Sequence, residues 1–309
     1  MSTHPVTVRG LSERRLTPAQ RSAFAADGYL APLPLLSAEE SARARAQLAA
    51  VLAAHSGRAD ARLRNSPHLL LRWVSDLARD ARLLDAVQDL LGPDLLILRT
   101  TLFVKPPRDR GVVAWHQDLA YWDLSDSGCV TAWLALTDST VANGCVQVVR
   151  ASHRDGPVAH RTTDVADNRL VRGQQAEVDV AAARVVDLEL RAGEMSLHHG
   201  LLLHGSPGNP SGTLRAGLAV RCISPATRQA GPRASATLAR GVDVYGHFDH
   251  QPVPRFDGDP VAATWHRRAV RRLALQVLWE CMRRPSWRDV STLGRLALRR
   301  DLRRAVMGR

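Results

Sequence analysis

Apolar and polar positions divide the chain into a helical first third and a middle built of strands. Three helices are predicted, over residues 19–27, 37–55 and 76–91. Ser37 begins the second helix as its N-cap, and Glu40 three positions later completes a capping box. Gly28 and Gly92 follow the first and third helices, and glycine is the residue that most often ends a helix.

The middle of the chain carries short apolar segments separated by glycine, proline and asparagine. They predict strands over residues 95–104, 130–136, 146–149, 185–190, 195–203 and 214–223. Asn143-Gly144 is a strong turn signal between two of these strands. Many short strands separated by turns indicate an antiparallel sandwich or barrel. From about residue 262 the pattern is helical again, to the end of the chain.

The net charge of +12 suggests an anionic partner such as nucleic acid, but its position changes that interpretation. Residues 1–265 hold 29 basic and 27 acidic residues, whereas residues 266–309 hold 13 arginines and 3 acids. The body is nearly neutral, so we expect no nucleic-acid partner. The basic extension fits weak contact with an anionic membrane through amphipathic helices or, as we favour, terminal helices packed on the core.

Four cysteines form no C-x-x-C pair and are too sparse for a disulfide scaffold. The first 31 residues contain no apolar run of signal-peptide length, and no segment of the chain reaches transmembrane length. These features predict a protein of the reducing cytoplasm. They do not predict its oligomeric state.

Trp115-His-Gln-Asp118 is the first segment that indicates chemistry. In an extended chain, side chains two residues apart point to the same side, so His116 and Asp118 can aim at one point. With a second histidine they would form the two-histidine, one-carboxylate set that leaves positions open on Fe(II). Alone the pair is a weak signal, because ordinary hydrogen-bonded pairs explain most such spacings.

Three histidines within seven residues are candidates for the third ligand. His198 and His204 share one face of the predicted strand, and His199 takes the other. A histidine in an apolar strand is more often a core residue than a ligand, but three so close together favour a function. Alternation along the strand does not choose between His198 and His204.

Between Thr100 and Cys222 the sequence resembles the phytanoyl-CoA dioxygenase family of Fe(II)- and 2-oxoglutarate-dependent oxygenases. The blocks that match in order and spacing are Leu102-Phe-Val-Lys-Pro-Pro, Trp115-His-Gln-Asp, Thr131-Ala-Trp-Leu-Ala-Leu-Thr-Asp, Asn143-Gly-Cys-Val-Gln-Val-Val-Arg-Ala-Ser-His, Gly193-Glu-Met-Ser-Leu-His-His, and Leu203-His-Gly-Ser-Pro-Gly-Asn-Pro-Ser with Arg215. The resemblance implies a mainly β protein with flanking helices, whose core is a double-stranded β-helix, the cupin-like jelly roll. It also implies that His116, Asp118 and His204 are the metal ligands.

The same resemblance implies a site for 2-oxoglutarate, whose distal carboxylate needs a cation. A guanidinium offers a planar fork for a carboxylate. Arg215, eleven residues after His204, stands where the family has this arginine, and Arg221, with the same strand parity, is the competing candidate. Ser206 matches a hydroxyl that donates to the same carboxylate in the family.

Three further positions match residues that line the cosubstrate pocket in the family: Gln117, Trp133 and Thr101. For Trp133 and Thr101, core packing is an equally good interpretation. Lys105 precedes two prolines and is expected in a loop, so it receives no role.

The function implied by the resemblance is hydroxylation of an unactivated carbon of a small molecule, with consumption of oxygen and release of succinate and carbon dioxide. Related halogenases replace the carboxylate with a small residue, so Asp118 favours hydroxylation or another oxidation over chlorination. Tailoring of a bacterial natural product is the preferred interpretation, and an acyl-CoA or other lipid-like substrate is the alternative. Segment 241–249 either caps the site, with Tyr245 and His247 touching substrate, or is a structural loop.

The predicted organisation is a single oxygenase domain followed by an extension. The domain comprises a helical part (1–92), the jelly-roll core (93–225) and a capping segment (226–265), and the basic helical extension covers 266–309. Loss of a ligand or of Arg215 would instead indicate a non-catalytic cupin-like binding protein, but all of these residues are present.

Overall fold

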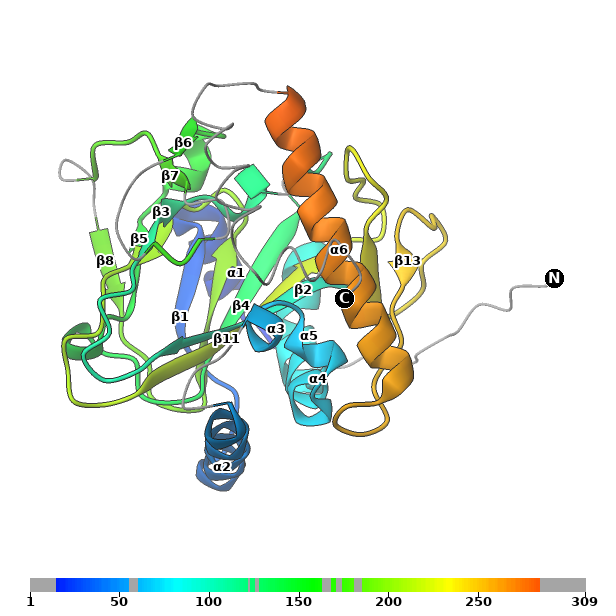
Figure 1. Ribbon diagram of the computed structural model, residues 1–309. Helices are drawn as coiled ribbons and strands as arrows, with labels where there is room; N and C mark the ends of the chain where they lie inside the picture. Colours follow the sequence, from blue (N-terminus) through cyan, green and yellow to red (C-terminus); the bar gives the residue numbers. More distant parts are fainter. Residues whose placement is uncertain are drawn as a thin grey trace.

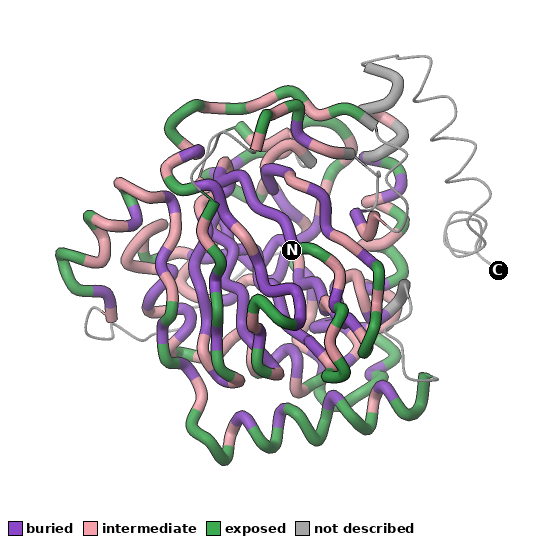
Figure 2. The backbone as a smooth tube through the Cα atoms, turned by 90° about the vertical axis from the view of Figure 1, so that its left-hand side faces the viewer, coloured by how far each residue is buried: buried purple, intermediate pink, exposed green. Residues whose placement is uncertain are grey.

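The computed structural model describes residues 15–55, 61–121, 123–125, 128–162, 168–170, 174–180 and 185–283. Two facing sheets, antiparallel except where two edge strands pair, form its centre, and helices cover the outer face of the larger one (Figure 1). The burial colouring shows the central strands almost continuously buried, whereas the helices at the periphery alternate between buried and exposed positions (Figure 2).

Six α-helices are described: α1 (Pro18–Asp27), α2 (Ala38–Ala54), α3 (Ala61–Arg64), α4 (Arg72–Ala78), α5 (Ala81–Leu91) and α6 (Pro260–Arg283). Four short 3-10 helices accompany them: η1 (Pro67–Leu69), η2 (Asp118–Tyr121), η3 (Val141–Asn143) and η4 (Ser152–Asp155). The predicted capping box of α2 is confirmed, because Glu40 N donates to Ser37 Oγ and Ser37 N donates to the Glu40 carboxylate. The helix predicted over 76–91 is instead two helices, since Asp80 caps α5.

The larger sheet has the strand order β1-β9-β4-β11-β2-β12-β13 and the smaller one β3-β10-β5-β8. The strands of the larger sheet are β1 (Tyr29–Pro34), β9 (Glu194–His199), β4 (Cys129–Ala135), β11 (Arg215–Ile223), β2 (Leu95–Lys105), β12 (Ser235–Arg240) and β13 (Asp249–His250). The smaller sheet contains β3 (Val113–His116), β10 (His204–Ser206), β5 (Val146–Val149) and β8 (Val185–Leu188). A separate pair joins β6 (His160–Thr162) to β7 (Gln174–Ala176).

The two faces of the larger sheet differ in chemistry. Even-numbered positions of β11, and of β2 from Leu102 onward, pack in the main apolar core with the helices, as Leu102 and Leu218 do. The odd-numbered positions of these segments face the smaller sheet, and several of them are polar: Thr101, Lys105, Arg215 and Arg221. A sheet with one apolar face and one polar inner face positions charged side chains inside the jelly roll.

The structure corrects three predictions about where elements lie. β1 was missed in the part predicted as helical, and it pairs with β9 at the sheet edge, where Pro32 and Pro34 are tolerated. The strand predicted over 195–203 ends at His199, and His204 begins a new strand in the other sheet. β12 and β13 extend the larger sheet beyond residue 225, so the core does not end there.

Helix α6 crosses the boundary drawn from charge at residue 265 and packs against η1, with His266 Nε2 2.8 Å from Asn65 O. Arginine pairs beyond residue 283, and with them most of the proposed membrane contact, lie outside the described residues. Among the helices that the structure describes, none is long and apolar enough to cross a membrane.

Candidate active site

Three potential metal ligands meet between the two sheets. One ligand atom each of His116, Asp118 and His204 lies within 4.8 Å of the other two, and all three residues are buried. His116 and His204 are register partners on the neighbouring strands β3 and β10, with ring centroids 4.1 Å apart. Nε2 of His116 lies 3.9 Å from Oδ1 of Asp118, which opens η2 directly after the strand.

Backbone carbonyls fix the tautomers of both histidines. Nδ1 of His116 lies 2.9 Å from Ala114 O, and Nδ1 of His204 lies 2.9 Å from Leu202 O. Since a carbonyl oxygen only accepts, each Nδ1 carries the proton and each Nε2 keeps its lone pair for a metal. Burial, followed by the neighbouring His204, lowers the pKa of His116 well below its usual value, which favours this neutral form.

Asp118 is held as a carboxylate by two residues of the larger sheet. Thr131 Oγ1 donates to its Oδ2 at 2.6 Å, and Arg221 Nε donates to its Oδ1 at 3.2 Å. Burial alone would raise the pKa of Asp118, but Arg221, the two histidines and Thr131 hold that pKa well below its usual value. A carboxylate beside two neutral imidazoles is the donor set that suits Fe(II), so these residues fit the ion.

His198 is buried on the inner face of β9 but lies outside this group. Its ring centroid is 5.6 Å from that of His204, and its Nε2 lies 2.8 Å from Ser196 Oγ. Burial, with His204, lowers the pKa of His198 to about 3. His204 converges with His116 because the chain leaves the larger sheet after β9, a change of sheet that alternation along one strand does not reveal.

The two candidate arginines of β11 have different surroundings. Arg221 donates to Asp118 and, through Nη1, to Thr101 Oγ1 at 2.7 Å. Arg215 is 1% exposed, yet no carboxylate pairs with it among the described residues. Its Nε donates to Ser139 Oγ at 3.3 Å, and its Nη2 is buried without a hydrogen-bond partner in the described part of the chain.

A carboxylate ligand would satisfy Arg215. Burial lowers the pKa of Arg215 to about 10, so the side chain is still a cation at neutral pH. Its guanidinium lies 4.6 Å from the ring centroid of Trp133, two residues along β4 from Thr131. Two residues of strand span about 7 Å, which suits a five-carbon diacid extending from the metal group to Arg215.

Lys105 is a functional candidate that the sequence did not reveal. The expected loop position is wrong: Lys105 is the fully buried last residue of β2 and the register partner of Arg215. Its Nζ donates to Ser206 Oγ at 2.7 Å and to Pro207 O. Burial, with the charge of Arg215, lowers the pKa of Lys105 to about 7. The parity of β2, which puts Lys105 on the face of Thr101, was the available signal.

The other predicted pocket residues have distinct surroundings. The Gln117 amide is occupied by backbone groups: Nε2 donates to Gly156 O and Leu201 O, at 2.9 Å and 2.7 Å, and Oε1 accepts from Val158 N at 2.9 Å. It ties a loop to the segment before His204, so we give it a structural role. Trp133 packs between the sheets as well as beside Arg215.

Tyr245 and His247 are not brought to the metal group. Their rings lie 5.7 Å apart in the loop between β12 and β13, and Tyr245 is 55% exposed. β13 is three strands from β11, about 14 Å across the sheet. Figure 1 shows β13 on the opposite side of the molecule from β3. The geometry therefore gives no support to a substrate contact at these residues.

Two facing sheets with a His-Asp-His group between them define a jelly-roll protein with a candidate non-haem metal centre, and comparison with known proteins agrees. The phytanoyl-CoA dioxygenase (PhyH) family model matches residues 24–217, more than half of the chain. The chain belongs to this family. The predicted jelly-roll fold and the predicted membership of this oxygenase family are thereby confirmed.

The curated relatives share only about a quarter of their residues with this chain, over part of its length. The probable alpha-ketoglutarate-dependent hypophosphite dioxygenase of Stutzerimonas stutzeri is 26% identical over 149 residues, which cover 47% of this chain and 51% of that protein. Ectoine dioxygenase of Nocardia farcinica is 27% identical over 214 residues, covering 62% and 72%. The chain thus spans about half the length of the first of these relatives.

Solved structures share the whole fold. The non-heme monooxygenase ThoJ superposes with a TM-score of 0.76 at 32% identity, over 85% of this chain and 99% of that one. CytC3 with Fe(II) and alpha-ketoglutarate gives a TM-score of 0.60 at 21% identity, over 80% and 97%, and supports the fold alone.

Proposed function

We propose that this protein is an Fe(II)- and 2-oxoglutarate-dependent dioxygenase that hydroxylates a carbon of a small molecule. His116, Asp118 and His204 bind the iron, and Arg215 binds the distal carboxylate of 2-oxoglutarate. The observation that carries the proposal is the pairing of a buried His-Asp-His group with a buried arginine that lacks a counter-ion among the described residues.

The side chains of this protein would orient the reactants and exclude water. Bound iron would supply the oxidising chemistry, in which oxygen converts 2-oxoglutarate to succinate and carbon dioxide and inserts one oxygen atom into a C–H bond. The carbonyls of Ala114 and Leu202 orient the two imidazoles. Lys105 adds a second cation beside Arg215 and holds Ser206 at the same end of the pocket.

The substrate class is inferred less directly. ThoJ, the neighbour with 32% identity, is described as a non-heme monooxygenase, and a second structure of it contains nickel. We favour a small secondary metabolite of a bacterial pathway, with an acyl-CoA or other lipid-like compound as the alternative. Asp118 fills the position that chloride would need, so hydroxylation, and not chlorination, is the expected outcome; chlorinated product from enzyme with iron, 2-oxoglutarate and chloride would contradict this.

Absorbance under anaerobic conditions tests the proposal without a known substrate. Fe(II) and 2-oxoglutarate together should give the weak visible charge-transfer band of a chelated keto acid. Arg215→Met should require far more 2-oxoglutarate for the same band, whereas the surface variant Arg233→Gln should behave like the unaltered protein. Folded protein without any band would indicate the alternative class, a cupin-like binding protein without oxygenase activity.

A further inference from the structure

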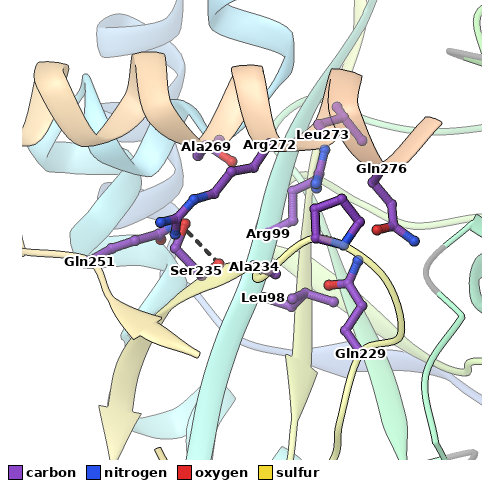
Figure 3. Close-up of a pocket in the computed structure, with 12 residues that line it drawn as sticks. Leu98, Arg99, Gln229, Ala234, Ser235, Gln251, Ala269, Arg272, Leu273 and Gln276 are labelled. Atoms are coloured by element: carbon purple, nitrogen blue, oxygen red, sulfur yellow. Dashed lines mark hydrogen bonds between the residues drawn. The ribbon is translucent and has the colours of Figure 1, made fainter. Parts of the chain in front are cut away.

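A small cavity lies beneath helix α6, beside Leu98 and Arg99 of β2 (Figure 3). Its volume is about 20 Å³, which is room for one small polar group and not for a whole metabolite. Arg99 of β2 and Arg272 of α6 both line it, with Gln251 and Ser235 joined by a hydrogen bond at its wall.

Arg99 is a partly buried cation without a counter-ion among the residues that the structure describes. Its Nε atom is buried there with no hydrogen-bond partner. Burial, followed by the charge of Arg221, lowers the pKa of Arg99 to about 10, so it remains protonated at neutral pH. Because a buried donor without a partner costs free energy, an anion in the cavity that accepts from Nε would stabilise this side chain.

Arg272 adds a second donor that points to the same conclusion. Its Nη2 donates to Asp249, a carboxylate that also accepts from Arg233 at 2.7 Å. Its Nη1 is buried and has no hydrogen-bond partner in the described part of the chain. One carboxylate thus serves two arginines, and with Arg99 the cavity keeps an excess of positive charge.

Two neighbouring arginines link the cavity to the metal group. Arg99 is the register partner of Arg221, which donates to Asp118. Leu98, from the cavity wall, packs in the same apolar cluster as Leu119, the residue after Asp118. The inner face of β2 therefore runs from Arg99 at the cavity, past the metal group, to the cosubstrate cations at its other end.

We propose that the cavity between Arg99 and Arg272 binds a carboxylate of the primary substrate, so that the enzyme acts on an acidic small molecule. The proposal rests on the oxygenase function argued above and names its substrate class. The small volume favours a planar carboxylate over a tetrahedral phosphate or sulfate. Two guanidinium groups provide the charge-assisted hydrogen bonds that such a group needs.

Acetate is the probe for this cavity, and acetamide is its neutral counterpart. Both are titrated calorimetrically, without oxygen, into enzyme loaded with Fe(II) and saturating 2-oxoglutarate, which keeps acetate from Arg215. Acetate should bind one saturable site, acetamide should not, and sulfate should bind more weakly than acetate. Arg99→Met and Arg272→Gln should each weaken acetate binding at least about tenfold, whereas Arg99→Lys should retain most of it.

Two controls separate binding from structure. Arg233→Gln removes the other partner of Asp249 outside the cavity and should leave acetate binding unchanged. Without acetate, Arg99→Met should melt at the same temperature as the unaltered protein or higher, because a buried donor without a partner has been removed. A purely structural Arg99 would instead lower the melting temperature and leave acetate binding alone.

Acetate binding that is unchanged in Arg99→Met, or acetamide binding as tight as acetate, would overturn the proposal, and tighter sulfate binding would overturn the choice of a carboxylate. Failure of the oxygenase function has a different signature. In that case the charge-transfer band is absent, while acetate binding still depends on Arg99. A normal band without saturable acetate binding refutes the cavity proposal alone.

Discussion

Arg215 and Arg221 lie on the same face of one strand, six residues apart, but their surroundings differ. Arg221 has its carboxylate within the chain, Asp118, and a threonine hydroxyl as a further acceptor. Arg215 has one long hydrogen bond to Ser139, the aromatic face of Trp133, and a buried Nη2 without a partner among the described residues.

This difference indicates what each cation is for. A buried guanidinium with a carboxylate in its own chain orients that carboxylate, so Arg221 orients Asp118, the proposed metal ligand. A buried guanidinium without a carboxylate in its own chain is destabilised by the loss of its hydration until a ligand provides an anion. Arg99 is only partly buried, but it resembles Arg215, and differs from its register partner Arg221, in having a buried nitrogen without a partner among the described residues.

The largest expected effect concerns the choice between two histidines. His204→Ala should abolish substrate-dependent formation of succinate and should lower iron affinity at least about 100-fold, because a ligand is lost. His198→Ala should leave iron bound, since His198 contacts Ser196 and lies outside the triad. The iron content and the rate of succinate formation are measured for both variants. Turnover retained in His204→Ala but lost in His198→Ala would reverse the assignment.

The two arginines should separate in binding experiments. Arg215→Met should weaken the binding of 2-oxoglutarate about 100-fold, because a buried charge pair with the ligand is lost, and should leave the affinity for iron nearly unchanged. Arg221→Met should instead weaken iron binding about tenfold, because Asp118 loses the donor that orients it. Titrations of iron and of 2-oxoglutarate on each variant provide the measurement. Equal losses of both ligands in both variants would show that the two sites are not distinct.

Lys105 predicts a pH dependence of cosubstrate affinity. Its pKa is lowered to about 7 by burial and by Arg215 and Arg169, against the opposing charge of Asp109. The ammonium group therefore loses its proton as the pH rises through about 7, while the carboxylates of 2-oxoglutarate stay ionised. The affinity for 2-oxoglutarate should fall about tenfold between pH 6.5 and 8.5.

Two substitutions show whether Lys105 is the titrating group. Lys105→Arg keeps its charge throughout this range and should bind 2-oxoglutarate with little pH dependence. Lys105→Met should bind weakly at every pH and should lack the slope as well. The same slope in Lys105→Met as in the unaltered protein would assign the dependence to another group.

Sequence patterns predicted the parts of the fold that depend on neighbouring residues. The cap at Ser37 and the strand β11 followed from local signals. β1 and β13 did not, because they are short edge strands whose pairing depends on distant partners. The split between α4 and α5 was missed because one apolar periodicity continues through Asp80.

The site was predictable where residues act through motif spacing and less so where they act through the sheet register. His116, Asp118, His204 and Arg215 were predicted from the resemblance, and the structure brings the first three together. Lys105 was missed because its partner in the register, Arg215, is 110 residues away in the sequence. Strand β9 ends at His199, and the next strand, which begins at His204, belongs to the other sheet. This change of sheet has no local sequence signal strong enough to be recognised.

The smallest expected effect distinguishes direct from indirect support of Asp118. Thr101 accepts from Arg221, which in turn donates to Asp118, whereas Thr131 donates to Asp118 itself. Thr101→Val should therefore weaken iron binding only about threefold, the effect of one neutral hydrogen bond acting through a neighbour. Thr131→Val makes the same change of side chain and should weaken iron binding more, by about tenfold, because a hydrogen bond to a charged group is lost. Iron titrations of the two variants make the comparison, and a larger loss in Thr101→Val would show that Arg221 orients Asp118 more strongly than Thr131 does.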